Sequence, residues 1–294
     1  MPDHSLLRIV NGPSLRRPVF IAAFAGWNDA GQAATFALRS LQRSWSAERF
    51  ADIDAEEFFD FTETRPLINL GAAGQRSLEW PENAFFYRKM PDAETDVVLL
   101  IGTEPQLRWR TFCRLITDLA ADLDASSLLT CGALLADVPH TVEPRVTGFA
   151  TTPALMPELR SLGVRHSSYE GPTGILGALH DAWSTTRRPA LSLWSNVPHY
   201  ISAAPNPQAA LALMQRAAAL LKVQLPLGPL ETQAGAFRRQ IDDALNENPE
   251  AREYVRQLEA HFASENPGPT APELIEELER YLRTRPPPGE SSQG

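Results

Sequence analysis

Residues 18–41 read PVFIAAFAGWNDAGQAATFALRSL, and this stretch contains the pattern that decides the fold. A run rich in β-forming residues, 18–24, stops at the turn residues GWND. Apolar residues then recur at helical spacing from Ala30 to Leu41. This order predicts a buried strand that is followed directly by a helix, and it recurs along the first 225 residues.

Four further units extend the pattern. The predicted strands are 96–101 (DVVLLI), 127–136 (SLLTCGALLA), a short strand before 169–174, and the apolar run that begins at Ala190; the predicted helices are 111–123, a helix from about Gly174, and 207–221. Near-continuous apolar strands that alternate with helices predict a parallel sheet covered by helices on both faces. Between the first two units, residues 55–70 alternate in part and predict a strand pair, and residues 80–96 predict a hairpin or an edge strand.

The pattern becomes helical throughout after Pro229. Apolar residues are spaced by four at Phe237, Ile241 and Leu245, and a second such series begins at Tyr254. A third amphipathic helix is predicted around 274–282. We therefore expect an α/β core domain over 1–225, a helical subdomain over 226–284 that forms a lid or an interface, and a disordered tail over 285–294.

Composition narrows the class of protein. The chain has 294 residues, of which 43% are hydrophobic and 21% charged, as in a globular protein with a sizeable core. Its net charge of −9 argues against nucleic acid or an anionic membrane as a partner. Cys113 and Cys131 are expected to be reduced core residues outside any metal-binding spacing, so neither a metal nor a cofactor is expected. Because the sequence has no long apolar window and no leader pattern, we expect a cytoplasmic location.

Polar clusters follow the predicted strands at 26–31, 102–110, 136–141, 169–174 and 195–200. The carboxyl ends of parallel strands lie along one edge of a sheet, so these corners are expected to converge there. The candidate pocket residues are Trp27, Asn28, Asp29, Glu104, Arg110, His140, Glu170, Thr173, His199 and Tyr200. Turn chemistry alone also places Gly, Pro, Asn and Asp at such corners.

Each acidic or amide candidate has an ordinary structural alternative. Asn28 or Asp29 fits a helix N-cap as well as a ligand contact. Trp27 either packs under a neighbouring loop or stacks on a flat ligand. Glu104 either pairs with Arg110 or leaves that arginine free to hold an anion.

The histidines and the 170–174 turn are equally open to two interpretations. His140 and His199 share the context Val-Pro-His, and two histidines at one edge could transfer protons or bind a metal, although loop histidines are commonly structural. The EGPTG turn is similar to an anion-binding nest at a helix N-terminus, but it lacks the lysine and the length of a P-loop.

Taken together, GWNDAG with AATFALRSL, GTEPQLRWRTF, GALLADVPHT, YEGPTGILGAL and SLWSNVPHY resemble the actinobacterial members of the proteasome assembly chaperone 2 family. The resemblance covers about residues 15–225, and the C-terminal helices are similar to those of the same branch. It implies a three-layer αβα sandwich with a mostly parallel sheet, related to phosphorylase/hydrolase-like folds. It also implies a homo-oligomer, expected to be a trimer, and a partner among proteasome α-subunits.

One departure bears on how such a partner would be bound. Proteasome-binding relatives often end in a hydrophobic-Tyr-any tripeptide, whereas this sequence ends Ser292-Gln293-Gly294. We therefore expect contact through a folded surface rather than through an inserted tail. The first functional hypothesis is a non-enzymatic, chaperone-like interaction protein. The alternative is a small-molecule-binding protein or a hydrolase- or phosphorylase-like enzyme with a pocket at the carboxyl edge.

Overall fold

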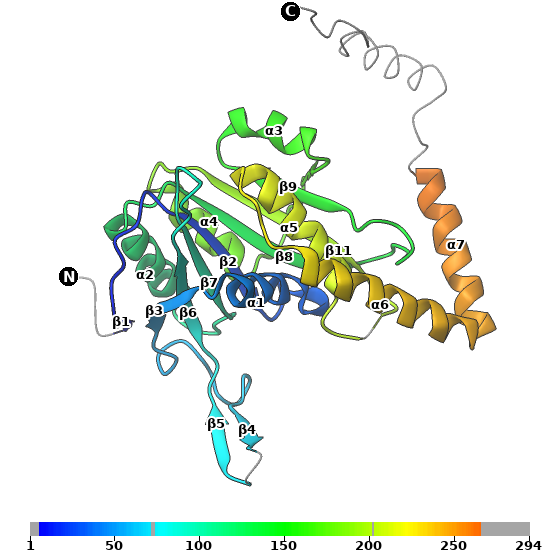
Figure 1. Cartoon of the computed structure of the whole chain (residues 1–294), viewed down its shortest axis with the longest axis horizontal. Helices are drawn as coiled ribbons and strands as arrows, with labels where there is room; N and C mark the ends of the chain where they lie inside the picture. The colour runs from blue at the N-terminus through cyan, green and yellow to red at the C-terminus, as the bar shows by residue number, and fades with distance from the viewer. Residues whose placement is uncertain (1–5, 72–73, 202, 266–294) are drawn as a thin grey trace, which may run out of the picture. The chain divides into compact units, whose positions relative to one another are not determined.

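The computed structural model describes residues 6–71, 74–201 and 203–265 (Figure 1). Nine strands form one sheet in the order β1-β3-β6-β7-β2-β8-β11-β9-β10, and β4 pairs with β5 in a separate two-stranded sheet. The strands are β1 (Leu7–Ile9), β2 (Val19–Ala25), β3 (Glu48–Ile53), β4 (Leu67–Leu70), β5 (Arg76–Glu79), β6 (Asn83–Arg88), β7 (Val97–Thr103), β8 (Ser127–Ala136), β9 (Val146–Ala150), β10 (Arg165–His166) and β11 (Ala190–Pro198). The α-helices are α1 (Ala33–Trp45), α2 (Trp109–Asp122), α3 (Met156–Ser161), α4 (Ile175–Ser184), α5 (Pro207–Leu221), α6 (Gly228–Asn246) and α7 (Pro249–Glu265).

The centre of the sheet consists of four parallel strands, β7, β2, β8 and β11. Alternate residues of β2 belong to different cores: Phe20 and Phe24 lie in one cluster, and Ile21 and Ala23 lie in the other. A strand that is buried on both faces needs apolar residues at every position, which explains the continuous run in the sequence. The predicted α/β sandwich is confirmed.

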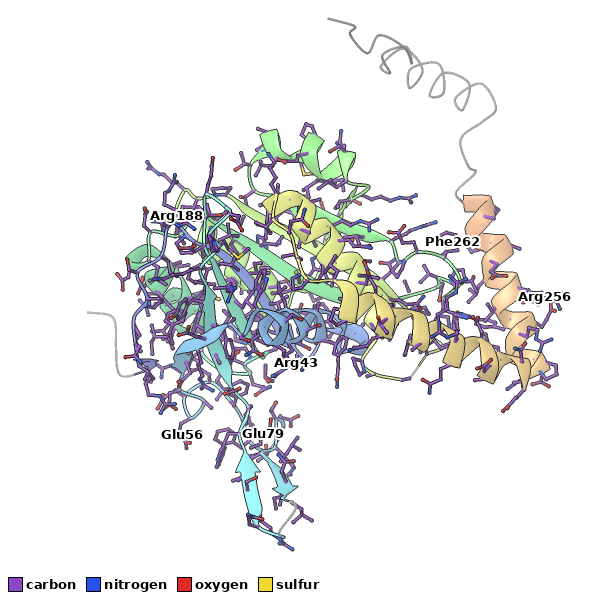
Figure 2. All side chains as sticks on the ribbon, viewed as in Figure 1. Arg43, Glu56, Glu79, Arg188, Arg256 and Phe262 are labelled. Atoms are coloured by element: carbon purple, nitrogen blue, oxygen red, sulfur yellow. The ribbon has the colours of Figure 1, made fainter. Side chains whose placement is uncertain are left out.

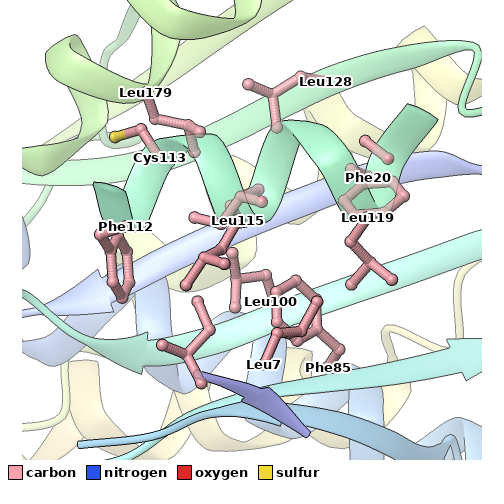
Figure 3. Close-up of a cluster of buried hydrophobic side chains, with 14 of the residues drawn as sticks. Leu7, Phe20, Phe85, Leu100, Phe112, Cys113, Leu115, Leu119, Leu128 and Leu179 are labelled. Carbon is pink, nitrogen blue, oxygen red and sulfur yellow. The ribbon is translucent and has the colours of Figure 1, made fainter. Parts of the chain in front are cut away.

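Helices cover both faces of this sheet. On one face, α2 and α4 pack on the strands, and Figure 3 shows Phe112, Leu115 and Leu119 of α2 against Phe20 and Leu100. On the other face, α1 and α5 build the second cluster. Each such side chain that is fully buried contributes about 1.5–3 kcal/mol relative to exposure, so the two clusters supply most of the driving force for folding.

The flanks of the sheet differ from the sequence prediction. Residues 80–96 were expected to form a hairpin or an edge strand, but β6 lies inside the sheet and is antiparallel to both β3 and β7. Residues 55–66 form turns rather than a strand, and β4 begins at Leu67. Phe58 and Phe59 are buried in the α2-side core, so the partial alternation of this segment reflects packing of a loop and not strand pairing.

The chain divides into two compact units, residues 1–244 and 245–294, and α6 spans the division. The predicted boundary lies earlier, at 225; in the structure, Leu230 of α6 is buried in the same cluster as α5. The two helices expected after Pro229 are present as α6 and α7. The helix predicted around 274–282 and the predicted tail lie outside the described residues. Within the described part of the chain, no helix is both long and apolar enough to cross a bilayer.

Candidate functional site

Four of the five polar corners follow parallel strands and therefore meet at one edge of the sheet. These are 26–31, 102–110, 136–141 and 195–200, which come after β2, β7, β8 and β11. The fifth, 169–174, follows β10, and that strand runs the opposite way because it is parallel to β9 and β9 is antiparallel to β11. The chain nevertheless returns to the same edge before α4. We call these five segments together the carboxyl rim.

The return of the chain is visible at Gly174, the residue before α4. A Cβ atom there would lie 2.4 Å from Asn28 Nδ2 and 2.6 Å from Glu104 Oε1. Those distances are far below any real contact, so the backbone of the 169–174 corner passes directly over the first two corners. Glycine is required here because of this close approach and not because of its backbone angles.

Glu104 joins three of the corners. Its Oε1 accepts hydrogen bonds from Asn28 Nδ2 at 2.9 Å and from the backbone N–H of Ile175 at 2.7 Å, and its Oε2 accepts from the N–H of Trp27 at 3.2 Å. Ile175 is the first residue of α4, so the carboxylate lies at the positive end of that helix. The position at which the sequence suggested an external anion therefore holds a carboxylate of this chain.

Asp29 is buried and interacts with the start of α1. Its Oδ1 accepts from the backbone N–H groups of Ala34 at 2.7 Å and Thr35 at 3.3 Å, and the Thr35 hydroxyl donates to Oδ2. A short 3₁₀ turn separates Asp29 from α1, and the side chain reaches over it. Burial raises the pKa of Asp29, although the bonds from Thr35 and Ala34 oppose this rise. These contacts perform the work of an N-cap, and a ligand role for Asp29 stays a prediction.

Tyr200 brings the two histidines together. Its hydroxyl accepts from the backbone N–H of His140 at 2.8 Å and lies 2.6 Å from His140 Nδ1. When Nδ1 accepts the Tyr200 hydroxyl proton, Nε2 carries the ring proton and faces Asp242 Oδ1 at 3.1 Å. His140 is thereby held between a tyrosine and α6.

His199 also contacts Tyr200. The ring centroids of His199 and Tyr200 are 5.8 Å apart, and those of His140 and Tyr200 are 5.9 Å apart. His199 Nδ1 is 2.9 Å from Asp137 Oδ1. The expected juxtaposition of the histidines is present in the geometry, but each ring already has a carboxylate neighbour. Their use in catalysis stays a prediction.

The remaining candidates are exposed side chains: Trp27, Arg110, Glu170 and Thr173. Their role in a pocket stays a prediction. Within residues 6–71, 74–201 and 203–265, no ion pair joins Glu104 to Arg110, and no group of three His, Cys, Asp or Glu side chains could hold a metal ion. Instead of the salt bridge to Arg110 that the sequence suggested, Glu104 forms hydrogen bonds with the first corner and with the start of α4.

Three features of the rim were missed in the sequence. Tyr169 and Leu107 are exposed on corners adjoining Trp27, so each of three corners exposes a large apolar side chain. Asp242 contacts His140 from a helix 102 residues further along the chain. The Oδ1 atom of Asn28 is buried and has no hydrogen-bond partner among the described residues. The aromatic residues of the 26–31 and 169–174 corners could have indicated this surface, whereas the other two features depend on tertiary contacts.

Comparison with known proteins places this arrangement among solved structures. A PAC2 family protein from Streptomyces avermitilis is 42% identical over 81% of this chain and 99% of its own, with a TM-score of 0.72. A proteasome-assembly chaperone homologue from Mycobacterium tuberculosis is 41% identical with the same coverage and TM-score. An archaeal proteasome activator from Pyrococcus furiosus, 19% identical over 81% of this chain and 97% of its own, shares the fold with a TM-score of 0.66.

Comparison with curated proteins gives no match. The model of the PAC2 family matches residues 23–245, which include the end of β2 and its GWND corner, the whole carboxyl rim, and α6 up to Leu245. The two bacterial structures are similar over most of the same region. The chain therefore belongs to the PAC2 family.

Proposed function

We propose that this protein is a non-enzymatic, chaperone-like interaction protein that binds proteasome α-subunits through its carboxyl rim. The family membership supports the chaperone-like role, and the M. tuberculosis relative is described as a proteasome-assembly chaperone homologue. The P. furiosus activator adds support at the level of the fold. The rim is the surface at issue because it gathers exposed apolar side chains beside a rigid backbone.

One observation carries this proposal: three large apolar side chains of the rim are exposed, whereas its buried polar side chains are bonded within the chain. Glu104, Asp29 and His140 are bonded within the chain, while Trp27, Leu107 and Tyr169 are exposed, Trp27 to 65% and Tyr169 to 67%. Exposed aromatic patches are typical of protein-binding surfaces, and tryptophan and tyrosine are the residues most often found to dominate binding energy.

The test is capture of co-expressed proteasome α-subunits by the tagged full-length chain. We expect Trp27→Ala to weaken capture by about 30-fold, which corresponds to the loss of about 2 kcal/mol expected at a dominant contact. Val10→Ala is the matched control, because Val10 is also 65% exposed but belongs to the β1 edge of the sheet. Equal capture by wild type and Trp27→Ala, or no enrichment of α-subunits over an unrelated acidic protein, would contradict the proposal.

One observation favours the alternative of a small-molecule site. The buried Asn28 Oδ1 lacks a donor among the described residues, and Asn28 lies beside Glu104 and Gly174. A ligand with a hydroxyl or amino group could supply that donor. A thermal-shift screen of nucleosides, nucleotides and short peptides tests this alternative, because a ligand at 100 times its Kd adds about 2.7 kcal/mol to stability. A flat response across the screen would leave the protein-binding role as the sole proposal.

A further inference from the structure

The hairpin of β4 and β5 is a second exposed apolar feature, distinct from the carboxyl rim. It forms its own two-stranded sheet, and in Figure 1 it extends away from the nine-stranded sheet. Figure 2 shows its side chains standing clear on both sides, with Glu79 labelled on β5. Every residue of both strands is exposed. An isolated two-stranded hairpin is at best marginally stable in water, so this one gains stability when another element packs on it.

The two faces of the hairpin differ in chemistry. Ile68 is opposite Leu78, so these side chains share a face, and Leu70 lies on the same face two residues along. The other face carries Asn69 and Ser77, and the Asn69 amide donates to Glu79 Oε2 at 2.7 Å. The first face therefore carries three apolar side chains and Arg76, which is opposite Leu70, and every one of these residues is exposed in the described part of the chain.

The outer edge of β4 is free to form backbone hydrogen bonds. Gly71 N–H donates to the carbonyl of Gln75, so the pair 71/75 is a hydrogen-bonded pair of the antiparallel ladder. Bonded and non-bonded pairs alternate, which makes 69/77 bonded and leaves 68/78 and 70/76 non-bonded. The N–H and C=O groups of Ile68 and Leu70 consequently point outward from β4.

The two strands of the hairpin differ in the charges that could prevent another strand from pairing with them. The sequence of β4 is Leu-Ile-Asn-Leu, with no charge, whereas β5 carries Arg76 and Glu79. Charged residues protect an edge from pairing, and β4 lacks that protection. Two copies of this chain, each with a net charge of −9, repel one another as whole bodies. Contact through β4 alone, which carries no charge, brings no like charges into direct opposition.

The strand is also complementary to itself. Ile68 and Leu70 flank Asn69 symmetrically, and both have outward backbone groups and apolar side chains. We propose that β4 pairs antiparallel with β4 of a second copy about a two-fold axis at Asn69, with Ile68 opposite the second copy's Leu70. The result is a four-stranded sheet in which Ile68, Leu70 and Leu78 of both copies form one apolar cluster, with each Arg76 at its margin. This contact is two-fold, so it is separate from the trimer expected from the family resemblance, and it does not depend on proteasome binding.

A cysteine cross-link tests the register. In the proposed pairing, Asn69 faces its own copy in a non-bonded pair, where Cα atoms are about 4.5 Å apart and a disulfide fits. Asn69→Cys should therefore form a disulfide-linked dimer under mild oxidation, as seen on a non-reducing gel. Ser77→Cys should not form this dimer, because Ser77 is on the same face but on β5, which does not pair with the second copy. The native Cys113 and Cys131 give little background, since burial raises the pKa of each thiol to about 12. Absence of the Asn69→Cys dimer, or equal cross-linking by both variants, would overturn the proposal.

A charge substitution tests the apolar face by light scattering of the full-length chain. Leu67 and Ile68 are neighbours with the same exposure, 62%, but they lie on opposite faces of β4. We expect the wild-type mass to rise with concentration toward an even multiple of 32.4 kDa. Ile68→Asp should halve that limiting mass, and Leu67→Asp should leave it unchanged. Equal masses for the wild type and Ile68→Asp, or equal losses in the two variants, would refute pairing through this face.

Discussion

His180 provides a direct test of how the core is packed, because a titratable ring is buried there without a compensating charge. The ring lies on α4, its Nε2 is 2.8 Å from the Thr130 hydroxyl, and it packs at 4.8 Å on Phe149. Its Nδ1 is buried and has no hydrogen-bond partner among the described residues. Protonation would place an N–H at Nδ1 with no acceptor. Burial accordingly lowers the pKa of His180 from 6.5 to about 4.

The size of the effect follows from linkage. A histidine whose pKa is lower in the folded state favours folding when it is neutral. Its contribution is complete above pH 6.5 and is lost as the pH falls toward about 4, because the unfolded chain binds the proton first. The difference between 6.5 and 4 is about 2.5 pKa units, and at 1.36 kcal/mol per unit this is worth about 3 kcal/mol.

The assay is urea unfolding of the wild type and His180→Gln between pH 4 and pH 7.5. Glutamine keeps a polar group near the Thr130 hydroxyl but cannot titrate, so the stability difference between the two proteins should shift by about 3 kcal/mol across the window. Val10→Ala is the control, since Val10 is exposed and has no titratable group, and that variant should retain the wild-type pH dependence. Parallel pH profiles for the wild type and His180→Gln would refute the reasoning, and an NMR titration of the wild-type ring near pH 6.5 would refute it independently.

Three further predictions concern the rim. Glu104→Ala removes the acceptor of the Asn28 amide and of the first N–H of α4. We therefore expect the free energy of unfolding in urea to fall by about 2–3 kcal/mol, and by about half of that for Glu104→Gln. Equal losses in the two variants would show that hydrogen bonding by Glu104 is not the cause. Asp29→Ala should lower thermal stability by about 0.5–2 kcal/mol and leave α-subunit capture unchanged, as expected for a cap; lost capture at full stability would contradict this. Tyr200→Phe should cost about 1–3 kcal/mol because the His140 N–H and Nδ1 lose their partner, whereas Tyr169→Phe at an exposed site should stay within about 0.5 kcal/mol.

The central part of the fold could be predicted because its strands are buried on both faces. The segments 18–24, 96–101 and 127–136 are apolar at nearly every position, and each became a central strand. The flanking strands carry a weaker signal. β6 was mistaken for an edge strand because its polar start at Asn83 and charged end at Arg88 are typical of an edge, although it pairs on both sides. Pairing between distant segments cannot be read from local pattern alone.

The convergence of four corners could be predicted from topology, but their bonding could not. Parallel strands alone bring GWND and GTEP to one edge. That Glu104 reaches the start of α4, and not Arg110 six residues away, depends on the path by which 167–174 returns to that edge after β10. The role of Asp242 is similarly hidden, because an acidic residue on an amphipathic helix carries no signal until the helix is placed.

The internal bonding of the rim also bears on which partner it can accept. An external anion at the start of α4 would have to displace Glu104 and break its bonds to Trp27, Asn28 and Ile175, each of which is a charge-assisted bond worth about 1.5–3 kcal/mol. It would also meet the repulsion of that carboxylate. A protein that covers the exposed side chains of Trp27, Leu107 and Tyr169 needs no such displacement. The energetic balance at this edge therefore favours a macromolecular partner over a small anionic substrate.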